Sequence, residues 1–257
     1  MQPITVVKIG GNVIDNEAAL ERFLKRFASI EGPKMLIHGG GKLATRMATE
    51  LKLEVKMIDG RRVTDRPTLD VVTMVYAGLV NKQIVARLQA AGCNAIGMSG
   101  ADGNIVRAHR RPATPIDYGY VGDIDSVDSS LLGHLLEAGL VPIFSAIMHD
   151  GEGSLLNCNA DSVAQAIALG AAALAPTDLV FCFEKRGVLR DADNDDSVID
   201  RITPEIYATL REEGVVSGGM IPKIENALKA VAAGVKSVLI KCAEELLEES
   251  GTTIVNQ

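Results

Sequence analysis

The sequence has no tryptophan, few other aromatic residues and no excess of basic residues. Its 257 residues include no Trp and 4% aromatic side chains, so stacking of nucleic-acid bases on an aromatic surface is not expected. Lys and Arg total 26 against 33 Asp and Glu, which gives a formal net charge of −7. A protein that binds nucleic acid of any sequence must neutralise the phosphate charges with basic side chains. The charge balance therefore predicts no nucleic-acid partner, although it is compatible with a local cationic pocket.

Cysteine is scarce, and no CxxC pair or membrane-length apolar run is present. Without a CxxC pair among Cys93, Cys158, Cys182 and Cys242, neither a zinc ribbon nor a dithiol redox site is predicted. All four cysteines lie in or beside apolar segments and are expected to be buried and reduced. The amino terminus lacks a basic segment followed by an apolar one, so a targeting segment is not predicted. We expect a cytoplasmic protein with no membrane partner.

Two common nucleotide-binding signatures are also missing. The chain contains no GxxxxGK[ST] segment, which excludes a P-loop, and no predicted strand is followed by GxGxxG. A nicotinamide dinucleotide would therefore lack its usual phosphate-binding turn. Glycine itself is plentiful, at 25 residues, and suits tight turns between parallel strands and helices.

Short apolar segments alternate with segments of helical periodicity along most of the chain. Strands are predicted at 4–9, 35–37, 95–98, 141–147, 179–183, 237–241 and 252–255. Helices are predicted at 16–28, 43–51, 67–88, 131–139, 160–172, 204–213 and 222–233. This alternation predicts an α/β fold, a three-layer αβα sandwich with a mostly parallel open sheet, in one domain over residues 1–257. Residues 103–127 instead predict a hairpin excursion, and 190–197 an exposed acidic loop.

Glycine-rich or polar turns follow several predicted strands. They lie at residues 10–11, 38–41 and 99–103, and the segment 157–161 leads into a predicted helix. Ligands of open α/β sheets bind beyond the carboxyl ends of the strands. Glycines let backbone N–H groups approach an anion closely. One such turn is usually structural, but four at equivalent places predict a ligand that carries phosphate.

Three basic residues occupy positions with chemical consequences. Lys8 lies inside the first buried strand, where a charge is costly unless it is paired or faces a site, and we favour a site. Lys223 begins a predicted helix, where a cation opposes the helix dipole, so structural and anion-binding interpretations are equally supported. Arg62 suits bidentate binding of a carboxylate, although an arginine in a loop is often only solvated. We interpret His38 as an anchor of the following turn and not as a base.

Eight segments carry a resemblance to a known family. They are VVKIGGNVI (6–14), LIHGGGKLA (36–44), GRRVTD (60–65), LVNKQIVARL (79–88), YVGDID (120–125), LLEAGLVPIFSAI (135–147), LLNCNADSVAQAIA (155–168) and GGMIPKIENAL (218–228). In this order, over nearly the whole chain, they resemble the acetylglutamate kinases of the amino-acid kinase superfamily. Those enzymes phosphorylate a carboxylate with ATP. The resemblance implies an N-acyl-L-glutamate kinase of arginine biosynthesis with the amino-acid kinase fold.

The resemblance also implies three sets of site residues. It assigns catalysis to Lys8, Lys223 and Asp161. It assigns substrate binding to Gly11, Gly39, Gly40, Arg62, Asn157 and Asn159. It assigns nucleotide binding to Gly10, Glu184, Lys185, Gly187 and again Lys223.

These assignments imply a division of labour between two lobes. Residues 1–177 are expected to bind the acylated amino acid, with Arg62 on its α-carboxylate, and residues 178–257 to bind ATP. Asp161 is expected to orient Lys8 and Lys223, which contact the transferring phosphoryl group. Mg²⁺ is expected to arrive on the nucleotide, without a metal site built from the protein's own side chains.

The chain departs from the family pattern at three places, one of which is a shorter carboxy-terminal region before Gly251-Thr252. Phe183-Glu184 stands where a Ser/Thr-Asp pair is usual, which puts the nucleotide contacts of this stretch in question. Met148-His149 also differs and motivates the hypothesis of an N-succinyl in place of an N-acetyl substrate. The first strand begins near Ile4, which leaves no room for the amino-terminal helix that builds hexamers in arginine-inhibited members. We therefore expect a homodimer that is insensitive to arginine.

Two alternative functions remain open at this point. One is another amino-acid or carbamate kinase, against which chain length and Arg62 argue. The other is a ligand-sensing relative without catalysis, which the change at 183–185 permits.

Overall fold

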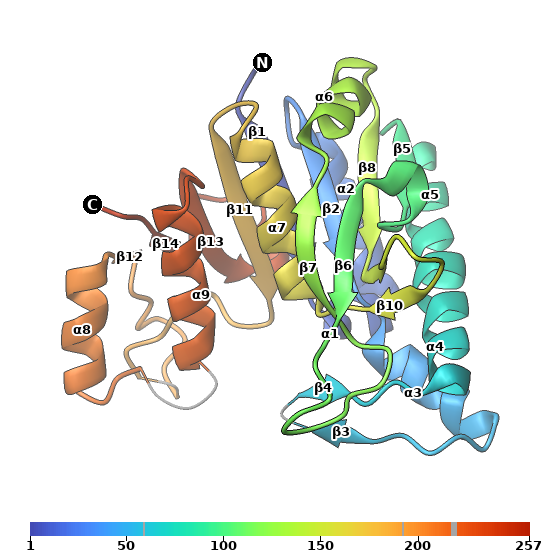
Figure 1. Cartoon of the computed structure of the whole chain (residues 1–257). Helices are drawn as coiled ribbons and strands as arrows, with labels where there is room; N and C mark the ends of the chain where they lie inside the picture. The colour runs from blue at the N-terminus through green and yellow to red at the C-terminus, as the bar shows by residue number, and fades with distance from the viewer. Residues whose placement is uncertain (59, 192, 217–219) are drawn as a thin grey trace.

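A mostly parallel sheet forms the centre of the molecule (Figure 1). The structure is a computed structural model and describes residues 1–58, 60–191, 193–216 and 220–257. Within these residues the sheet has eight strands in the order β12-β14-β13-β11-β1-β2-β8-β5, and β13–β14 is its antiparallel pair. The strand bounds are β1 (Ile4–Ile9), β2 (Lys34–His38), β5 (Ala95–Met98), β8 (Val141–Ser145), β11 (Thr177–Phe183), β12 (Arg201–Ile202), β13 (Ser237–Cys242) and β14 (Thr252–Ile254).

Helices cover both faces of this sheet, which confirms the predicted three-layer architecture. One face carries α2 (Glu17–Ser29), α3 (Gly41–Glu50), α4 (Arg66–Thr73), η1 (Met74–Val80) and α5 (Asn81–Ala90). The other carries α6 (Ser129–Glu137), α7 (Ala160–Ala172), α8 (Pro204–Glu212) and α9 (Met220–Ala232). Three short helices complete the set: α1 (Gly11–Asp15), η2 (Asp102–Asn104) and η3 (Ala243–Glu245).

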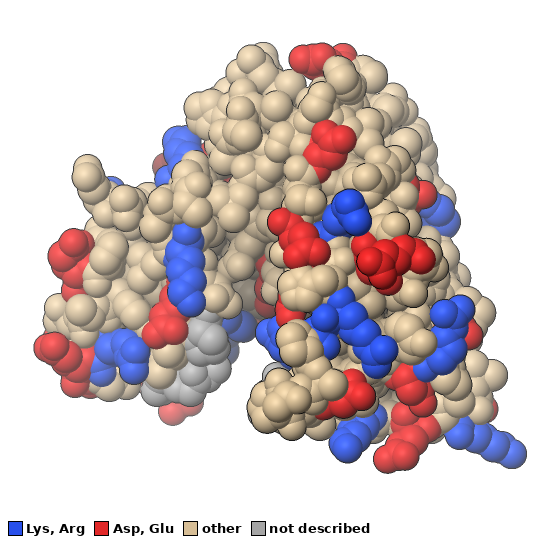
Figure 2. Space-filling view, in the orientation of Figure 1, with Lys and Arg blue, Asp and Glu red and all other residues tan. Residues whose placement is uncertain are grey.

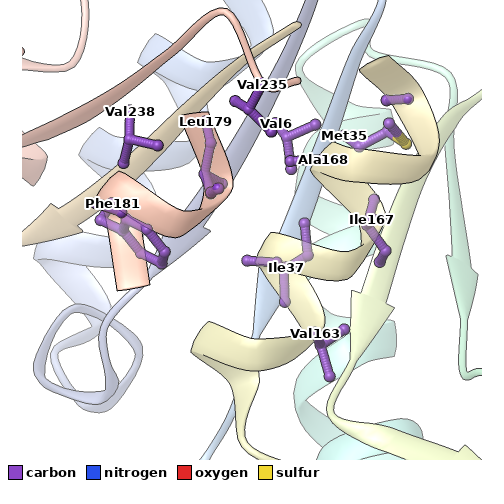
Figure 3. Packing of buried hydrophobic residues seen from close by; sticks show 14 of the residues in the cluster. Val6, Met35, Ile37, Val163, Ile167, Ala168, Leu179, Phe181, Val235 and Val238 are labelled. Atoms are coloured by element: carbon purple, nitrogen blue, oxygen red, sulfur yellow. The ribbon is translucent and has the colours of Figure 1, made fainter. Parts of the chain in front are cut away.

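Alternation along the strands divides the apolar core into two clusters. Ile4 and Val6 of β1 face α7 and α9, whereas Val7 and Ile9 face the α2 side. Figure 3 shows the first cluster, in which Val6 lies with side chains from β2, β11, β13 and α7. A buried strand of a covered sheet must be apolar on both sides. A lysine in β1 is therefore exceptional and must be explained by its surroundings.

The excursion at 103–127 forms a hairpin, as predicted. Its strands β6 (Val106–Arg110) and β7 (Gly122–Val127) join β9 (Ile147–His149) and β10 (Leu155–Asn157) in a second sheet, ordered β10-β9-β6-β7. A separate hairpin of β3 (Met57–Ile58) and β4 (Arg61–Arg62) was not predicted. The strand predicted at 141–147 is wrong in extent, because β8 stays in the main sheet and β9 leaves it to pair with β10.

The helix predicted at 67–88 extends continuously from 66 to 90, with π-helical geometry in its middle third. Its length and a mean hydropathy of 1.2 are compatible with a membrane span by composition alone, and 44% of the most apolar window is buried within the protein. Core helices meet the same criterion. A π-helical turn often occurs at a functional site, and here it places Tyr76 beside Gly40.

The cysteines are free, as predicted. Cys93, Cys158 and Cys182 are buried and Cys242 is half-buried. Burial raises the pKa of the Cys158 and Cys182 thiols to about 12. Both thiols therefore stay protonated at neutral pH and are poor nucleophiles.

Candidate active site

A lysine–aspartate ion pair lies at the carboxyl ends of the central strands. Lys8 follows Ile4 and Val6 on the same face of β1, so its side chain is directed toward α7 and α9. Its Nζ lies 2.7 Å from Oδ1 of Asp161, in the first turn of α7. The Lys8 side chain is 11% exposed and that of Asp161 is 36% exposed. The carboxylate offsets the cost of burying the ammonium, and both groups remain accessible to a ligand.

A second lysine approaches the same place from α9. The Nζ of Lys223 lies 4.1 Å from the centroid of the Phe183 ring, and the Nζ of Lys8 lies 5.3 Å from the same centroid. Lys223 forms no ion pair with a side chain in the part of the chain that the structure describes. The structure thus brings the three residues assigned to catalysis together around one aromatic ring. Gly218 and Gly219, which precede α9 in the motif, lie outside the described residues.

Asn159 caps the helix that carries Asp161. Its Oδ1 accepts hydrogen bonds from the backbone N–H groups of Asp161, at 2.8 Å, and Ser162, at 3.3 Å. An asparagine cap satisfies N–H groups that have no partner inside the helix. Asn159, assigned above to substrate binding, therefore also fixes the position of the Asp161 backbone. An asparagine directly before an Ala-Asp helix start is the signal that could have revealed this role.

A cavity of about 180 Å³ lies on the other side of the α7 amino terminus. Ala160 lines this cavity, while the next residue, Asp161, lines a smaller cavity that it shares with Phe183 and Lys223. The larger cavity is lined by Gly39, Gly40, Gly41, Met57, Gly60, Arg61, Arg62, Tyr76, Val121, Ala146, Asn157, Cys158, Asn159 and Ala160. Five of the six residues assigned to substrate binding are among them. A ligand in this cavity lies beside the lysine cluster.

Arg62 supplies a buried cation with unused hydrogen-bond donors. It is 7% exposed, and its Nη2 donates to the carbonyl of Gly41, at 2.9 Å, and to Oγ1 of Thr45, at 2.7 Å. Its Nε and Nη1 are buried without a hydrogen-bond partner among the described residues. Buried donors without partners are costly and uncommon. The cavity that Arg62 lines is therefore suited to an anionic ligand such as a carboxylate.

Thr64 links Arg62 to Asn157. Its hydroxyl is fully buried, donates to the carbonyl of Arg62 at 2.9 Å, and accepts a hydrogen bond from Nδ2 of Asn157 at 3.0 Å. The link fixes two cavity residues that lie on separate hairpins. Thr64 occurs in the GRRVTD motif, but nothing in the sequence indicates this role, because Asn157 is 93 residues away.

The glycine turn after β2 is held from behind. Gly40 has a φ of 156°, and a Cβ at this position would lie 3.0 Å from Cδ1 of Tyr76. His38 is fully buried; its Nδ1 donates to the carbonyl of Gly39 at 2.8 Å, and its Nε2 accepts from Nδ2 of Asn81 at 3.0 Å. Burial lowers the pKa of His38 to about 4. The neutral imidazole thus anchors the turn, in agreement with its interpretation as an anchor.

The first glycine turn, at residues 10–11, lines a cleft together with Lys8. Gly10, Gly11 and Glu184 line this cleft together with Lys8 and Phe183. The N–H of Gly10 donates to the carbonyl of Cys182 at 3.1 Å. This N–H is therefore already paired within the sheet, and the assignment of Gly10 to the nucleotide stays a prediction. Gly11, assigned to the acylated substrate, lies in this cleft and not in the 180 Å³ cavity.

Two residues assigned to the nucleotide lie outside the cavities described above. Lys185 is exposed and pairs with Asp195 at 2.8 Å. Gly187 is buried where a Cβ would lie 2.8 Å from Oγ1 of Thr252. Its position is thus explained by close packing between the loop after β11 and β14.

The residues that suggested a bulkier acyl group do not line the cavity. Met148 is fully buried and packs against Gly100. His149 accepts a hydrogen bond from the N–H of Gly151 at 3.2 Å. The turn at 99–103 does not line the cavity either, and Asp102 there accepts a hydrogen bond from the Ser99 N–H.

Charges of both signs are interspersed over the face shown in Figure 2. The view shows no continuous basic surface, as expected for an acidic chain. The cations at the site are Arg61 and Arg62, which line the 180 Å³ cavity, and Lys8 and Lys223 beside Phe183.

Comparison with known proteins extends these observations. The model of the amino acid kinase family matches residues 3–242. The chain is 51% identical over 253 residues to the acetylglutamate kinase of Phocaeicola vulgatus, with 98% of each chain covered. A solved structure from Streptococcus mutans UA159 has a TM-score of 0.78 at 31% identity and covers 100% of both chains. Carbamate kinase from Giardia lamblia bound to AMP-PNP has a TM-score of 0.71 at 12% identity over 99% of both chains, a likeness of fold alone.

Proposed function

The chain belongs to the amino acid kinase family, and we propose that it is an acetylglutamate kinase. It transfers the γ-phosphoryl group of ATP to the side-chain carboxylate of N-acetyl-L-glutamate, a step of arginine biosynthesis. The observation that carries the proposal is the position of the α7 amino terminus. On one side lies a cavity with unpaired Arg62 donors, and on the other lies the Lys8–Asp161–Lys223 cluster.

The cavity accounts for binding of the acceptor. Arg62 binds the α-carboxylate through its unpaired donors, because an arginine–carboxylate pair is strong when both groups are buried. Asn157 supports the same group, and Thr64 holds both residues. The carbonyl of the acetyl group and the amide nitrogen lie along the glycine turn 39–41. The reactive carboxylate is then directed past Asn159 toward Lys8.

The reaction requires positioning and charge neutralisation more than acid–base chemistry. A side-chain carboxylate is ionised at neutral pH, so it needs no general base. One of its oxygens forms a bond to the γ-phosphorus while the bond from that phosphorus to the β–γ bridging oxygen breaks, which releases ADP. Lys8 and Lys223 offset the charge on the phosphoryl oxygens, and Asp161 holds Lys8 in place.

The proposal includes the nucleotide and its metal. Residues 178–257 bind ATP and residues 1–177 bind the amino acid, with Lys8 shared between the two. Mg²⁺ enters with the phosphates, because it retains several waters and is commonly held through substrate phosphates. Bound there, it supplies additional neutralisation of phosphate charge. Glu184 directly follows Phe183 and lines the same cleft as Lys8.

We also propose a cytoplasmic homodimer. The helix 66–90 exposes two large apolar side chains, Met74 at 59% and Leu79 at 43%. Such side chains on one helix favour burial against a second copy. Light scattering of the purified protein should give twice the mass of the 27.2 kDa chain. A monomer at micromolar concentration would refute the dimer.

Trapping of the acyl phosphate tests the proposed activity. The protein is incubated with ATP, Mg²⁺ and N-acetyl-L-glutamate, and hydroxylamine converts the acyl phosphate to a hydroxamate that is measured by colour. N-succinyl-L-glutamate, L-glutamate and carbamate serve as competing acceptors. We expect the acetyl compound to be preferred, because Met148 and His149 do not line the cavity.

A variant provides the control for this assay. Lys8→Met removes one of the positioned cations and should lower kcat by about 10²–10³. A hydroxamate formed equally by wild type and Lys8→Met would refute the assigned site. ATP binding without turnover of any acceptor would favour the alternative of a ligand-sensing relative, and preference for carbamate would favour a carbamate kinase.

A further inference from the structure

Phe183 occupies the centre of the proposed phosphoryl-transfer site without carrying a group that can react. Its ring lies at the carboxyl end of β11, half-buried, with the ammonium groups of Lys223 and Lys8 at 4.1 and 5.3 Å from its centroid. Phe183 lines the cleft that contains Lys8 and also the cavity that contains Lys223. The ring thus forms the wall that the two lysines share.

We propose that Phe183 is a positioning residue that holds both ammonium groups for phosphoryl transfer through the face of its ring. The proposal rests on the kinase function proposed above. Two ammonium groups that converge on one site repel each other, and the Asp161 carboxylate pairs with Lys8. Lys223 has no ion pair within the described residues. The negative face of an aromatic ring attracts a cation within about 6 Å of its centroid.

The ring is itself fixed by its neighbours. Phe181 lies two residues earlier on the same face of β11, is 6% exposed, and stacks on Phe183 with centroids 6.2 Å apart and planes inclined by 17°. Phe181 also stands opposite Lys8 in the parallel register of β1 and β11. A buried ring and a paired strand therefore set the position of Phe183. Its face is rigid, whereas the Lys223 side chain it receives is long and flexible.

A purely structural role for Phe183 makes a different prediction. If the ring only fills space, any apolar side chain of similar size should support activity. If the ring holds the lysines through its electrons, activity should follow the electron density of the ring at constant shape. Fluorine withdraws electron density from an aromatic ring and changes its volume little, so a fluorinated series separates the two roles.

The experiment introduces 4-fluoro-, 3,5-difluoro- and 3,4,5-trifluorophenylalanine at position 183 by amber suppression in the full chain. We expect log kcat for hydroxamate formation to fall steadily with each fluorine, by about five- to tenfold at the trifluoro ring. KM for N-acetyl-L-glutamate should not change, because Phe183 does not line the Arg62 cavity. Phe183→Tyr should retain activity and Phe183→Leu should lose about as much as the trifluoro ring.

A spectroscopic measurement tests the same contact without reference to catalysis. In the free enzyme labelled with ¹³Cε-lysine, the Lys223 Cε protons should be shifted upfield by the ring current of Phe183. This shift should disappear in Phe183→Leu, with Lys223→Arg used to assign the signal. Circular dichroism and the melting temperature show whether each variant is folded.

The two measurements separate failure of this inference from failure of the proposed function. A wild-type protein that phosphorylates no acceptor but shows the ring-current shift refutes the kinase and leaves the lysine–ring contact established. Flat kcat values across the fluorinated series in an active kinase overturn the positioning role. Absence of the Lys223 shift in the folded wild type overturns it as well.

Discussion

Acidification should destabilise the protein through the buried imidazole of His38. The side chain is fully buried, donates from Nδ1 to Gly39 and accepts at Nε2 from Asn81. A proton added to Nε2 would place a charge in an apolar core. It would also turn Nε2 into a donor that faces the donor Nδ2 of Asn81. Burial therefore lowers the pKa of His38 from 6.5 to about 4 in the folded protein.

The sign and size of the effect follow from proton binding. Between pH 6.5 and about 4 the unfolded chain binds a proton at His38 that the folded protein does not, so the free energy of unfolding decreases as the pH falls. The whole difference in pKa corresponds to about 3 kcal/mol. Between pH 7 and pH 5 the expected loss is about 2 kcal/mol, or roughly 4–8 °C in melting temperature for a chain of this size.

Urea denaturation at pH 5, 6 and 7 measures this loss. His38→Gln removes the titrating group and keeps one donor and one acceptor, so its free energy of unfolding should fall about 2 kcal/mol less over the same range. His134→Gln, which removes an exposed imidazole from α6, is the matched control and should keep the wild-type dependence on pH. Parallel curves for wild type and His38→Gln would refute the reasoning.

Three further substitutions test the site and its support. Thr64→Val breaks the link to Asn157 and should raise KM for N-acetyl-L-glutamate about tenfold with kcat retained. The control Thr64→Ser keeps the hydroxyl and should behave as wild type. An unchanged KM in Thr64→Val contradicts the link. Lys34→Met leaves two carbonyl groups at the end of α2 without their donor and should lower the free energy of unfolding by about 1–3 kcal/mol in urea. Gly40→Ala should cost about 1–3 kcal/mol, because of its φ and its contact with Tyr76, whereas Gly41→Ala, with open space around the new methyl group, should be tolerated; equal melting temperatures would refute this difference.

Local pattern was sufficient to predict the alternating strands and helices. The predicted helix 160–172 coincides with α7, because an asparagine cap, an acidic first turn and apolar spacing all act within a few residues. Strand β3, strand β4 and the departure of β9 from the main sheet were missed. Two- and three-residue strands are too short to show a period, even though each pairs with a strand only a few residues away.

The candidate site, too, was predicted only in part from the sequence. An unusual lysine in a buried strand indicated Lys8 from the sequence, and family motifs indicated Asp161, Lys223 and Arg62. The pairing of the Gly10 N–H with Cys182 and the absence of Met148 from the cavity lining required the structure. Backbone hydrogen bonds and packing between strands decide such points, and neither is visible in the order of residues.

The sequence by itself determined the layered fold, the acidic and aromatic-poor surface and the residue types available for phosphoryl transfer. Periodicity, composition and turn chemistry act over short stretches of chain, so these properties can be derived from the sequence. The tertiary structure alone decided that Phe183 lies against both lysines and that Thr64 joins Arg62 to Asn157. Thr64 and Asn157 are 93 positions apart in the sequence, and Lys8 and Phe183 are 175 positions apart. Only the pairing of parallel strands and the packing of helices on their faces brings such residues within reach of each other.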